Sequence, residues 1–175
     1  MRLFVGLRPP AQVREVLASV LRYEDPAFRW TSPAQWHVTL RFFGAVADHE
    51  VAPLVAALAG VAAAEPAREV RLGPSTSRLG RGNLVVPVTG LDELGAEVEA
   101  ATADVGRPPS GRPFTGHLTL ARGRGRRGVP ARAVGHLLSA TWHVDDFALV
   151  RSRLHPDGAS YEDLASFPLG RSRPS

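Results

Sequence analysis

Two tetrapeptides of the form His-apolar-Thr-apolar occur 80 residues apart, HVTL at residues 37–40 and HLTL at residues 117–120. In a β-strand, residues two apart point to the same side. Each tetrapeptide therefore presents an imidazole and a hydroxyl on one face and two apolar side chains on the other. One copy would carry little information. Two copies on matching strand candidates predict two equivalent strands whose histidines and threonines converge.

Two converging imidazoles are suited to acid–base chemistry on a phosphodiester. One of His37 and His117, as neutral imidazole, would take a proton from water, and the other, as imidazolium, would protonate the departing oxygen. Thr39, Thr119 and an arginine would donate hydrogen bonds to the phosphoryl oxygens. Metal binding fits poorly, because the sequence contains no His-x-His or HExxH and neither tetrapeptide holds a carboxylate. Serine-hydrolase and phosphate-loop motifs are also missing. We therefore expect no metal and no cofactor.

Composition places these motifs in a soluble globular protein. The chain has 175 residues, 44% hydrophobic and 22% charged, and no cysteine. This composition disfavours disorder and excludes disulfides and thiolate zinc sites. No apolar run reaches the roughly 20 residues that span a bilayer, and the N-terminal LFVGL is too short for a secretory signal. We expect a cytoplasmic protein with no membrane contact. All 21 positive residues are arginine and the formal charge is +4, which permits a phosphate-bearing or nucleic-acid partner.

The elements that must position the motifs are short strands and amphipathic helices. Helical spacing predicts helices that contain the apolar residues 13–21, 51–61 (capped by Asp48) and 91–105, with a short helix at 130–139. The turn formed by residues 155–158 joins the last two strands. Strands outnumber helices and many connections look like hairpins, so we expect an α+β fold with antiparallel sheets. Strands are predicted at 2–7, 36–43, 68–73, 83–89, 114–122, 142–154 and 159–168.

Several segments together resemble the two-histidine phosphoesterases. They are RLFVGL near the N-terminus, Arg29-Trp30, WHVTLRFFG, PFTGHLTLAR and LVRSRLHPDGASYEDLASFPL. Within that superfamily the chain is similar to bacterial and archaeal RNA 2′,3′-cyclic phosphodiesterases, once described as 2′–5′ RNA ligases. The resemblance implies a bilobal α+β fold of two pseudo-symmetric lobes, each an antiparallel sheet with helices packed outside, and a cleft between them. It covers residues 1–169 as a single domain, and we expect residues 170–175 to form a flexible tail.

The resemblance also implies metal-independent hydrolysis of a terminal 2′,3′-cyclic phosphate to a 2′-phosphomonoester. By motif position, His37 is the proton donor to the 3′ oxygen and His117 is the acceptor that activates water. Thr39 and Thr119 hold the phosphate, and the family's arginine falls on Arg122. The substrates would be RNA ends or small cyclic nucleotides, and the protein is expected to act as a monomer. Two alternatives stay open: an RNA-end binding module without turnover, and 2′–5′ joining of RNA ends as the main activity.

Strict strand alternation leaves the arginines unsettled. Arg122 shares parity with the apolar residues of its tetrapeptide, so it needs a bend to reach the phosphate. Arg41 has the favourable parity with His37, or else is a solvated charge at the end of the strand. The glycine–arginine loop 123–128 could hold an RNA backbone or form an ordinary charged surface.

The remaining candidate residues have less specific interpretations. Trp30 and Trp36 are interpreted as core residues in preference to platforms for a base. The histidines outside the two tetrapeptides are interpreted as surface or capping residues, namely His49, His136, His143 and His155.

Overall fold

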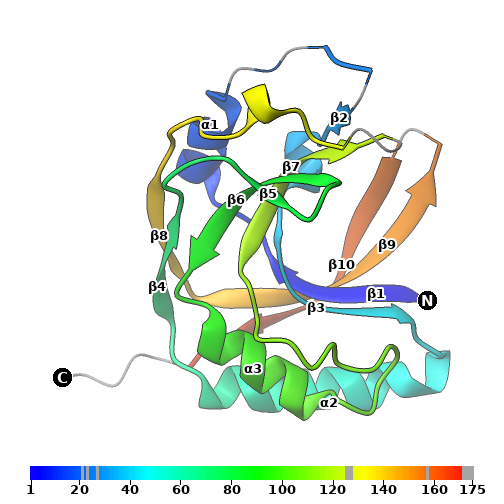
Figure 1. Ribbon diagram of the computed structural model, residues 1–175. Coiled ribbons are helices and arrows are strands. Elements are labelled where there is room, and N and C mark those ends of the chain that lie inside the picture. Colours follow the sequence, from blue (N-terminus) through cyan, green and yellow to red (C-terminus); the bar gives the residue numbers. More distant parts are fainter. Residues whose placement is uncertain (21, 23, 27, 125–127, 157, 171–175) are drawn as a thin grey trace.

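The computed structural model describes residues 1–20, 22, 24–26, 28–124, 128–156 and 158–170 (Figure 1). Apart from Gly170, the tail expected at 170–175 lies outside the described residues. Among the described helices, none has the length and apolar character needed to cross a membrane. The elements in chain order are β1 (Arg2–Leu7), α1 (Ala11–Ala18), β2 (Phe28–Trp30), η1 (Pro33–Gln35), β3 (Val38–Ala45), α2 (Asp48–Ala64), β4 (Arg68–Leu72), β5 (Ser77–Leu79), β6 (Asn83–Thr89), α3 (Asp92–Ala101), β7 (His117–Gly123), η3 (Ala131–Ala133), β8 (Ala140–Val144), β9 (Asp146–His155) and β10 (Gly158–Pro168).

The sheet is arranged symmetrically about its centre, in the order β10-β9-β1-β3-β7-β6-β4-β8. Chain order runs β1, α1, β3 in one half and β6, α3, β7 in the other, and β9 and β4 occupy matching outer places. The two motif strands, β3 and β7, meet at the single pair Val38 and Leu118. These are the residues that follow the histidine in each tetrapeptide, so a pseudo-twofold axis passes between them. The prediction of an α+β fold with two pseudo-symmetric antiparallel lobes is confirmed.

Helices cover the outside of the curled sheet. In Figure 1, α2 and α3 lie side by side at one end of the molecule, and α1 lies at the opposite end. Each helix buries apolar residues against the core, for example Leu58 in α2, Leu94 in α3 and Leu17 in α1, each 0% exposed. The apolar positions of both tetrapeptides join the same core, with exposed fractions of 0% for Val38, 5% for Leu40, 0% for Leu118 and 0% for Leu120. Burial of these faces leaves the histidine faces directed away from the core.

Each motif strand carries a β-bulge at the same position of its tetrapeptide. The consecutive β1 residues Gly6 and Val5 pair with Thr39 and Arg41, so Leu40 between them has no partner in β1. In the same way, Val85 and Leu84 of β6 pair with Thr119 and Ala121, so Leu120 has no partner in β6. An extra residue in one strand shifts the alternation of side chains by one beyond that point. The bulges therefore decide which of the following residues face the histidines.

The helix predictions need correction at several points. Of the helices expected to contain residues 13–21 and 91–105, α1 ends at Ala18, before Val20, and α3 ends at Ala101, before Val105. Asp48 is the first residue of α2 rather than its cap; the cap is Ala47, whose backbone N–H donates to the Glu50 carboxylate at 2.9 Å. The helix expected at 130–139 is reduced to the 3₁₀ turn η3. Gly135 has a φ of +88°, outside the helical region. Thr76 forms a hydrogen bond with a backbone group that a helix would use, because its Oγ1 donates to the Ala133 carbonyl at 2.8 Å.

The strand prediction for 142–154 is also wrong in one respect. The segment divides at Asp145 into β8, which pairs with β4, and β9, which pairs with β1 and β10. The chain thus crosses from one edge of the sheet to the other half at that residue. The short strands β2 and β5 were not predicted, because each has only three residues.

Candidate active site

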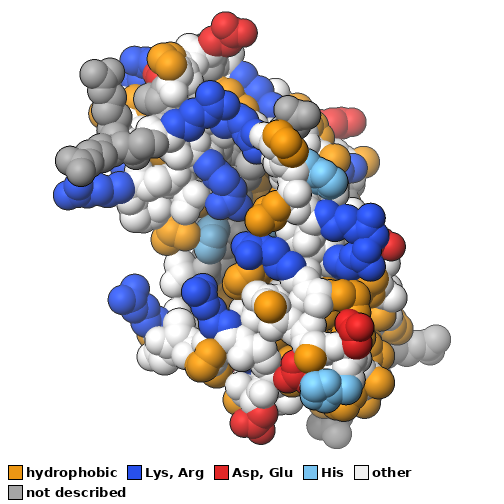
Figure 2. All heavy atoms as spheres, turned by 90° about the vertical axis from the view of Figure 1, so that its right-hand side faces the viewer, with side chains coloured by type: hydrophobic (Ala, Val, Ile, Leu, Met, Phe, Trp, Pro, Cys, Tyr) orange, Lys and Arg blue, Asp and Glu red, His pale blue; other side chains and the backbone are white. Residues whose placement is uncertain are grey.

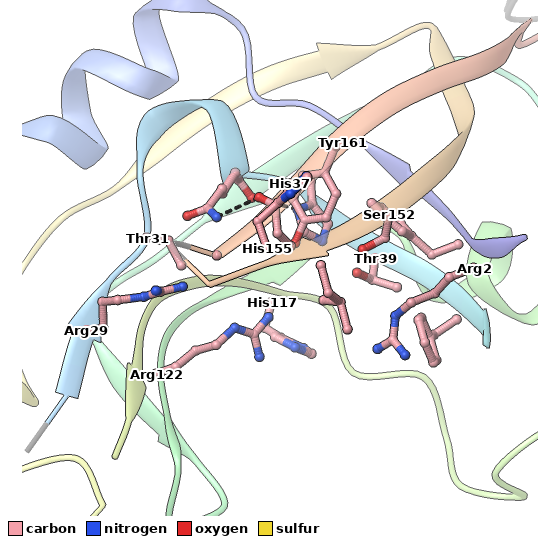
Figure 3. A pocket seen from close by; sticks show the side chains of 16 residues that line it. Arg2, Arg29, Thr31, His37, Thr39, His117, Arg122, Ser152, His155 and Tyr161 are labelled. Carbon is pink, nitrogen blue, oxygen red and sulfur yellow. Dashed lines mark hydrogen bonds between the residues drawn. The ribbon is translucent and has the colours of Figure 1, made fainter. Parts of the chain in front are cut away.

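Both tetrapeptides open onto one cavity of about 700 Å³. Figure 3 shows His37 and Thr39 on one side of it and His117 and Arg122 on the other. Of the five predicted site residues, only Thr119 is not among the lining residues. The lining comprises Arg2, Phe4, Arg29, Thr31, Gln35, His37, Thr39, Phe42, His117, Arg122, Ser152, Leu154, His155, Gly158, Ala159 and Tyr161.

The two imidazoles are held in the same way. Nδ1 of His37 lies 2.7 Å from the Gln35 carbonyl oxygen, and Nδ1 of His117 lies 2.8 Å from the Thr115 carbonyl oxygen. A carbonyl oxygen can only accept, so Nδ1 carries the proton in both rings. In the neutral tautomer Nε2 then has the free lone pair. Each ring therefore offers Nε2 for proton transfer.

Aromatic side chains enclose His37. Its ring centroid lies 4.7 Å from that of Phe4 and 5.0 Å from that of Tyr161. Burial lowers the pKa of His37 to about 4; the hydrogen bond to Gln35 opposes this shift, and the positive charges of Arg122, Arg8 and His117 add to it. Low-dielectric surroundings and like charges both disfavour the imidazolium form. His37 is consequently neutral at pH 7 in the free protein.

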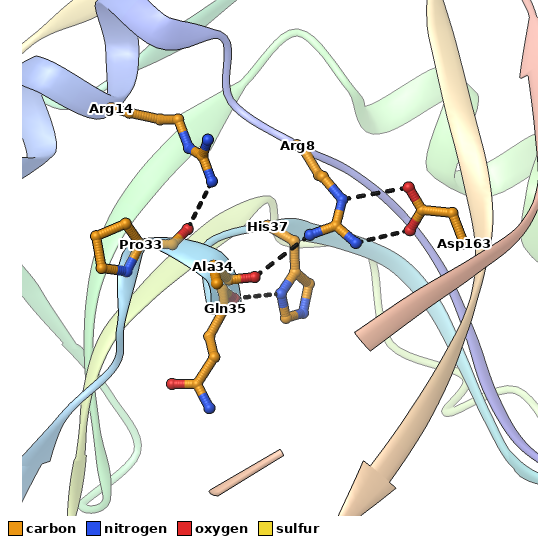
Figure 4. Close-up of polar contacts among 7 residues, drawn as sticks. All are labelled: Arg8, Arg14, Pro33, Ala34, Gln35, His37 and Asp163. Atoms are coloured by element: carbon orange, nitrogen blue, oxygen red, sulfur yellow. Dashed lines mark hydrogen bonds and ion pairs between the residues drawn. The ribbon is translucent and has the colours of Figure 1, made fainter. Parts of the chain in front are cut away.

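A turn braced by two arginines positions His37 (Figure 4). Arg8 donates to the Ala34 carbonyl at 3.3 Å and to the Asp163 carboxylate at 2.7 Å. Arg14 donates to the Pro33 carbonyl at 2.9 Å. These bonds tie η1, and with it the Gln35 carbonyl that orients the imidazole, to α1, to the residue that follows β1, and to β10.

The bulges settle the positions of the two arginines that strict alternation left open. Beyond Leu120 the alternation shifts, so Arg122 reaches the cavity while Ala121 joins the core at 0% exposed. Beyond Leu40 the same shift turns Arg41 inward, where it is 5% exposed. Both interpretations of Arg41, a residue facing the site and a solvated charge, are therefore wrong. Its place on the site face is taken by Phe42, the pseudo-twofold counterpart of Arg122.

Sequence reasoning missed several lining residues that come from outside the motif strands. Arg2 and Phe4 alternate in β1 with fully buried Leu3, so strand parity could have indicated them. Tyr161 and His155 come from the hairpin of β9 and β10, which no local pattern connects with the motifs. His155 lines the cavity, with Nε2 2.9 Å from Ser160 Oγ, so its interpretation as a surface or capping residue was incomplete.

The other candidates lie away from the cavity. Trp36 is 1% exposed and belongs to the core, as predicted. His49 and His143 are exposed and do not line the cavity. In the loop 123–128, Arg124 is exposed and is not a lining residue, whereas Arg126 and Arg127 lie outside the described residues.

The cavity carries positive charge without a compensating carboxylate among its described lining residues. Arg2, Arg29 and Arg122 line it, and no described Asp or Glu does. Figure 2 shows a hollow containing a histidine with arginine side chains around it, and acidic side chains toward the periphery of that face. Within the described part of the chain, no group of three or more His, Cys, Asp or Glu residues is placed to hold a metal ion. The site is arranged to attract an anion between two imidazoles.

Comparison with known sequences shows the repeat as well as the family. The model of the family described as LigT like Phosphoesterase matches twice, at residues 5–80 and at residues 86–161. The chain is 31% identical over 190 residues to the RNA 2′,3′-cyclic phosphodiesterase of Thermus thermophilus, covering 97% of this chain and 90% of that protein. It is 26% identical over 175 residues to the protein of the same name from Bacillus subtilis, covering 95% of each.

Solved structures share the fold over nearly the whole chain. The crystal structure of TT0787 from Thermus thermophilus superposes with a TM-score of 0.84 at 28% identity, covering 99% of this chain and 100% of that one. E. coli LigT complexed with 3′-AMP gives a TM-score of 0.78 at 24% identity, covering 96% and 97%. With two matches that span most of the sequence, the chain belongs to the LigT-like phosphoesterase family.

Proposed function

We propose that this protein hydrolyses RNA 2′,3′-cyclic phosphate ends to 2′-phosphomonoesters. One observation carries the proposal: two imidazoles with Nδ1 bound to backbone carbonyls share a cavity that three arginines and no described carboxylate line. Such a cavity suits a single phosphoryl group with a proton donor and a proton acceptor on either side. The relatives named RNA 2′,3′-cyclic phosphodiesterase support the same substrate class.

The reaction needs one proton removed and one supplied. Nε2 of His117 takes a proton from water as the water oxygen attacks phosphorus. The bond from phosphorus to the 3′ oxygen breaks, and Nε2 of His37 gives its proton to that oxygen, which leaves the phosphate on the 2′ oxygen. Arg122 and Thr39 donate to the phosphoryl oxygens as negative charge builds up, and by its place in the second tetrapeptide Thr119 is expected to do the same.

The low pKa of His37 sets a condition on this assignment. A group with a pKa of about 4 holds almost no proton at pH 7. A bound phosphodiester anion favours the imidazolium through coulombic attraction. His37 therefore takes up its proton together with the substrate, so the proton donor is charged only when a phosphate is present to be cleaved.

A product assay tests the proposed function. The protein is incubated with uridine 2′,3′-cyclic phosphate, and ³¹P NMR distinguishes the 2′-phosphomonoester from the 3′-isomer. Accumulation of uridine 2′-phosphate supports the proposal. Saturable binding without turnover would favour the RNA-end binding module instead. Joining with an RNA that ends in a 5′-hydroxyl, at a rate exceeding hydrolysis, would favour 2′–5′ end-joining.

We further propose that residues 1–169 act as one domain, as a monomer in the cytoplasm. The cavity draws its lining from residues 2 to 161 of a single chain, which supports a site complete in one copy. A sequence without cysteine needs no oxidising compartment to form disulfides, which is compatible with the cytoplasm. Light scattering after size exclusion should give the mass of one chain, and a dimer mass would contradict the proposal.

A further inference from the structure

A second hollow of about 570 Å³ adjoins the active-site cavity. The two share Arg2 and Phe42, and the second continues past them to Gly106 and Arg107. The Arg2 guanidinium carbon lies 4.6 Å from the centre of the Phe42 ring, so these two side chains form the common wall. The hollows together make a groove that leads out of the active site past Phe42.

The groove is positively charged along its length. Arg107 adds a fourth arginine to Arg2, Arg29 and Arg122, and no Asp or Glu in the described ranges lines either hollow. Guanidinium groups pair with phosphate oxygens through two parallel hydrogen bonds. Proteins that hold single-stranded nucleic acid combine a positive groove for the backbone with aromatic side chains for the bases, and Phe42 supplies an aromatic side chain at the middle of this groove.

The segment that carries Arg107 is fixed to the motif strand. The Arg107 backbone N–H donates to the Phe43 carbonyl at 2.7 Å. The buried Arg41 guanidinium donates to the carbonyls of Val105 at 3.2 Å and Arg107 at 3.1 Å. At Gly106, with a φ of +63°, an added Cβ would lie 2.6 Å from the Phe43 carbonyl oxygen, so only glycine permits this approach. The exposed Arg107 side chain thus extends from a rigid base.

We propose that Arg107 and Arg2 form a subsite for the phosphodiester that precedes the terminal nucleotide of an RNA strand. This rests on the proposed function, which places the cyclic phosphate between His37 and His117. The strand then leaves along the groove in its 5′ direction, past Phe42. The protein therefore prefers oligonucleotides that end in a cyclic phosphate over mononucleotides.

Substitution of Arg107 tests the subsite. The measured quantity is the ratio of kcat/KM for a uridine trinucleotide ending in a 2′,3′-cyclic phosphate to kcat/KM for uridine 2′,3′-cyclic phosphate. Arg107→Ala should lower this ratio about tenfold, the loss expected for one charge-assisted contact. The matched control is Arg71→Ala in β4, an exposed arginine that lines neither hollow. It removes the same charge and should leave the ratio as in the wild type.

A neutral linkage completes the test. In a trinucleotide whose last internucleotide linkage is a methylphosphonate, the wild-type ratio should also fall about tenfold, and Arg107→Ala should cause no further loss. An unchanged ratio in Arg107→Ala, or an equal loss in Arg71→Ala, would overturn the subsite. If the wild type hydrolyses neither substrate, the proposed function fails. Binding of a trinucleotide 2′-phosphate then decides the subsite separately: about tenfold weaker binding by Arg107→Ala upholds it, and equal binding overturns it.

Discussion

The pKa of His37 should rise steeply when an anion occupies the site. Burial lowers this pKa from its ordinary 6.5 to about 4, which corresponds to about 3.4 kcal/mol at about 1.4 kcal/mol per unit. A unit negative charge about 4 Å from the imidazolium, at an effective dielectric constant of about 20, contributes about 4 kcal/mol. That attraction equals about three pKa units. A bound anion should therefore bring the pKa of His37 back to about 7, where a proton donor works best at neutral pH.

NMR titration of the His37 ring measures this directly. The Cε1–H resonance is followed from pH 3.5 to 8.5 in chloride and in sulfate at matched ionic strength, because sulfate is a tetrahedral anion that does not titrate in this range. We expect a midpoint near 4 in chloride and an increase of two units or more in sulfate, in line with the coulombic attraction above. A midpoint already near 6.5 in chloride would refute the account of burial by Phe4 and Tyr161. A midpoint unmoved by saturating sulfate would refute the coupling to substrate charge.

Three further predictions concern stability and binding. The pKa of His37 is lower in the folded protein than in the unfolded chain, so folding stability should be lost as the pH falls from 6.5 to 4, by up to about 3.4 kcal/mol. In urea denaturation, the free energy of unfolding should therefore fall less between pH 7 and pH 4 in His37→Gln than in the wild type. An equal fall in both proteins would contradict this prediction. Arg41→Met removes hydrogen bonds to Thr102 and to backbone carbonyls after α3. The free energy of unfolding, measured by urea denaturation at pH 7, should fall by about 3 kcal/mol. A fall of less than about 1 kcal/mol would show that these hydrogen bonds contribute little to the fold. Arg122→Ala should lower kcat by about a hundredfold while leaving the melting temperature near that of the wild type, whereas wild-type kcat in this variant would exclude Arg122 from phosphate binding.

The repeated tetrapeptide was enough to predict the central architecture. Period-two alternation correctly places Val38, Leu40, Leu118 and Leu120 in the core, and the repeat correctly predicts two equivalent strands, β3 and β7, at the centre of the sheet. These features could be predicted because they depend on local patterns in the strands themselves.

Strict alternation failed at the bulges beyond Leu40 and Leu120. A bulge arises from how a strand pairs with its neighbour, here β1 and β6, and neither leucine differs locally from an ordinary strand residue. Alternation therefore predicts Arg41 on the face of the site or in solvent, whereas it is buried. It also leaves the position of Arg122 open, whereas Arg122 lines the cavity.

Residues brought to the site by distant pairing were also beyond a local pattern. His155 and Tyr161 line the cavity because β9 pairs with β1. Long-range pairing also explains why the segment 142–154 divides at Asp145, because β8 pairs with β4 whereas β9 pairs with β1. Thr119 shares the repeated pattern with Thr39 but is not among the lining residues, so its contact with phosphate stays a prediction.

The two-imidazole mechanism is tested most directly by kcat for uridine 2′,3′-cyclic phosphate in His37→Gln, His117→Gln and the double variant. General acid and general base catalysis each contribute about 10²- to 10⁴-fold, and groups that act together are strongly non-additive. We predict that each single variant loses at least about a hundredfold and that the double variant is little slower than the slower single one. Hydrolysis within about tenfold of the wild type in either single variant, or full multiplication of the two losses in the double variant, would contradict the account.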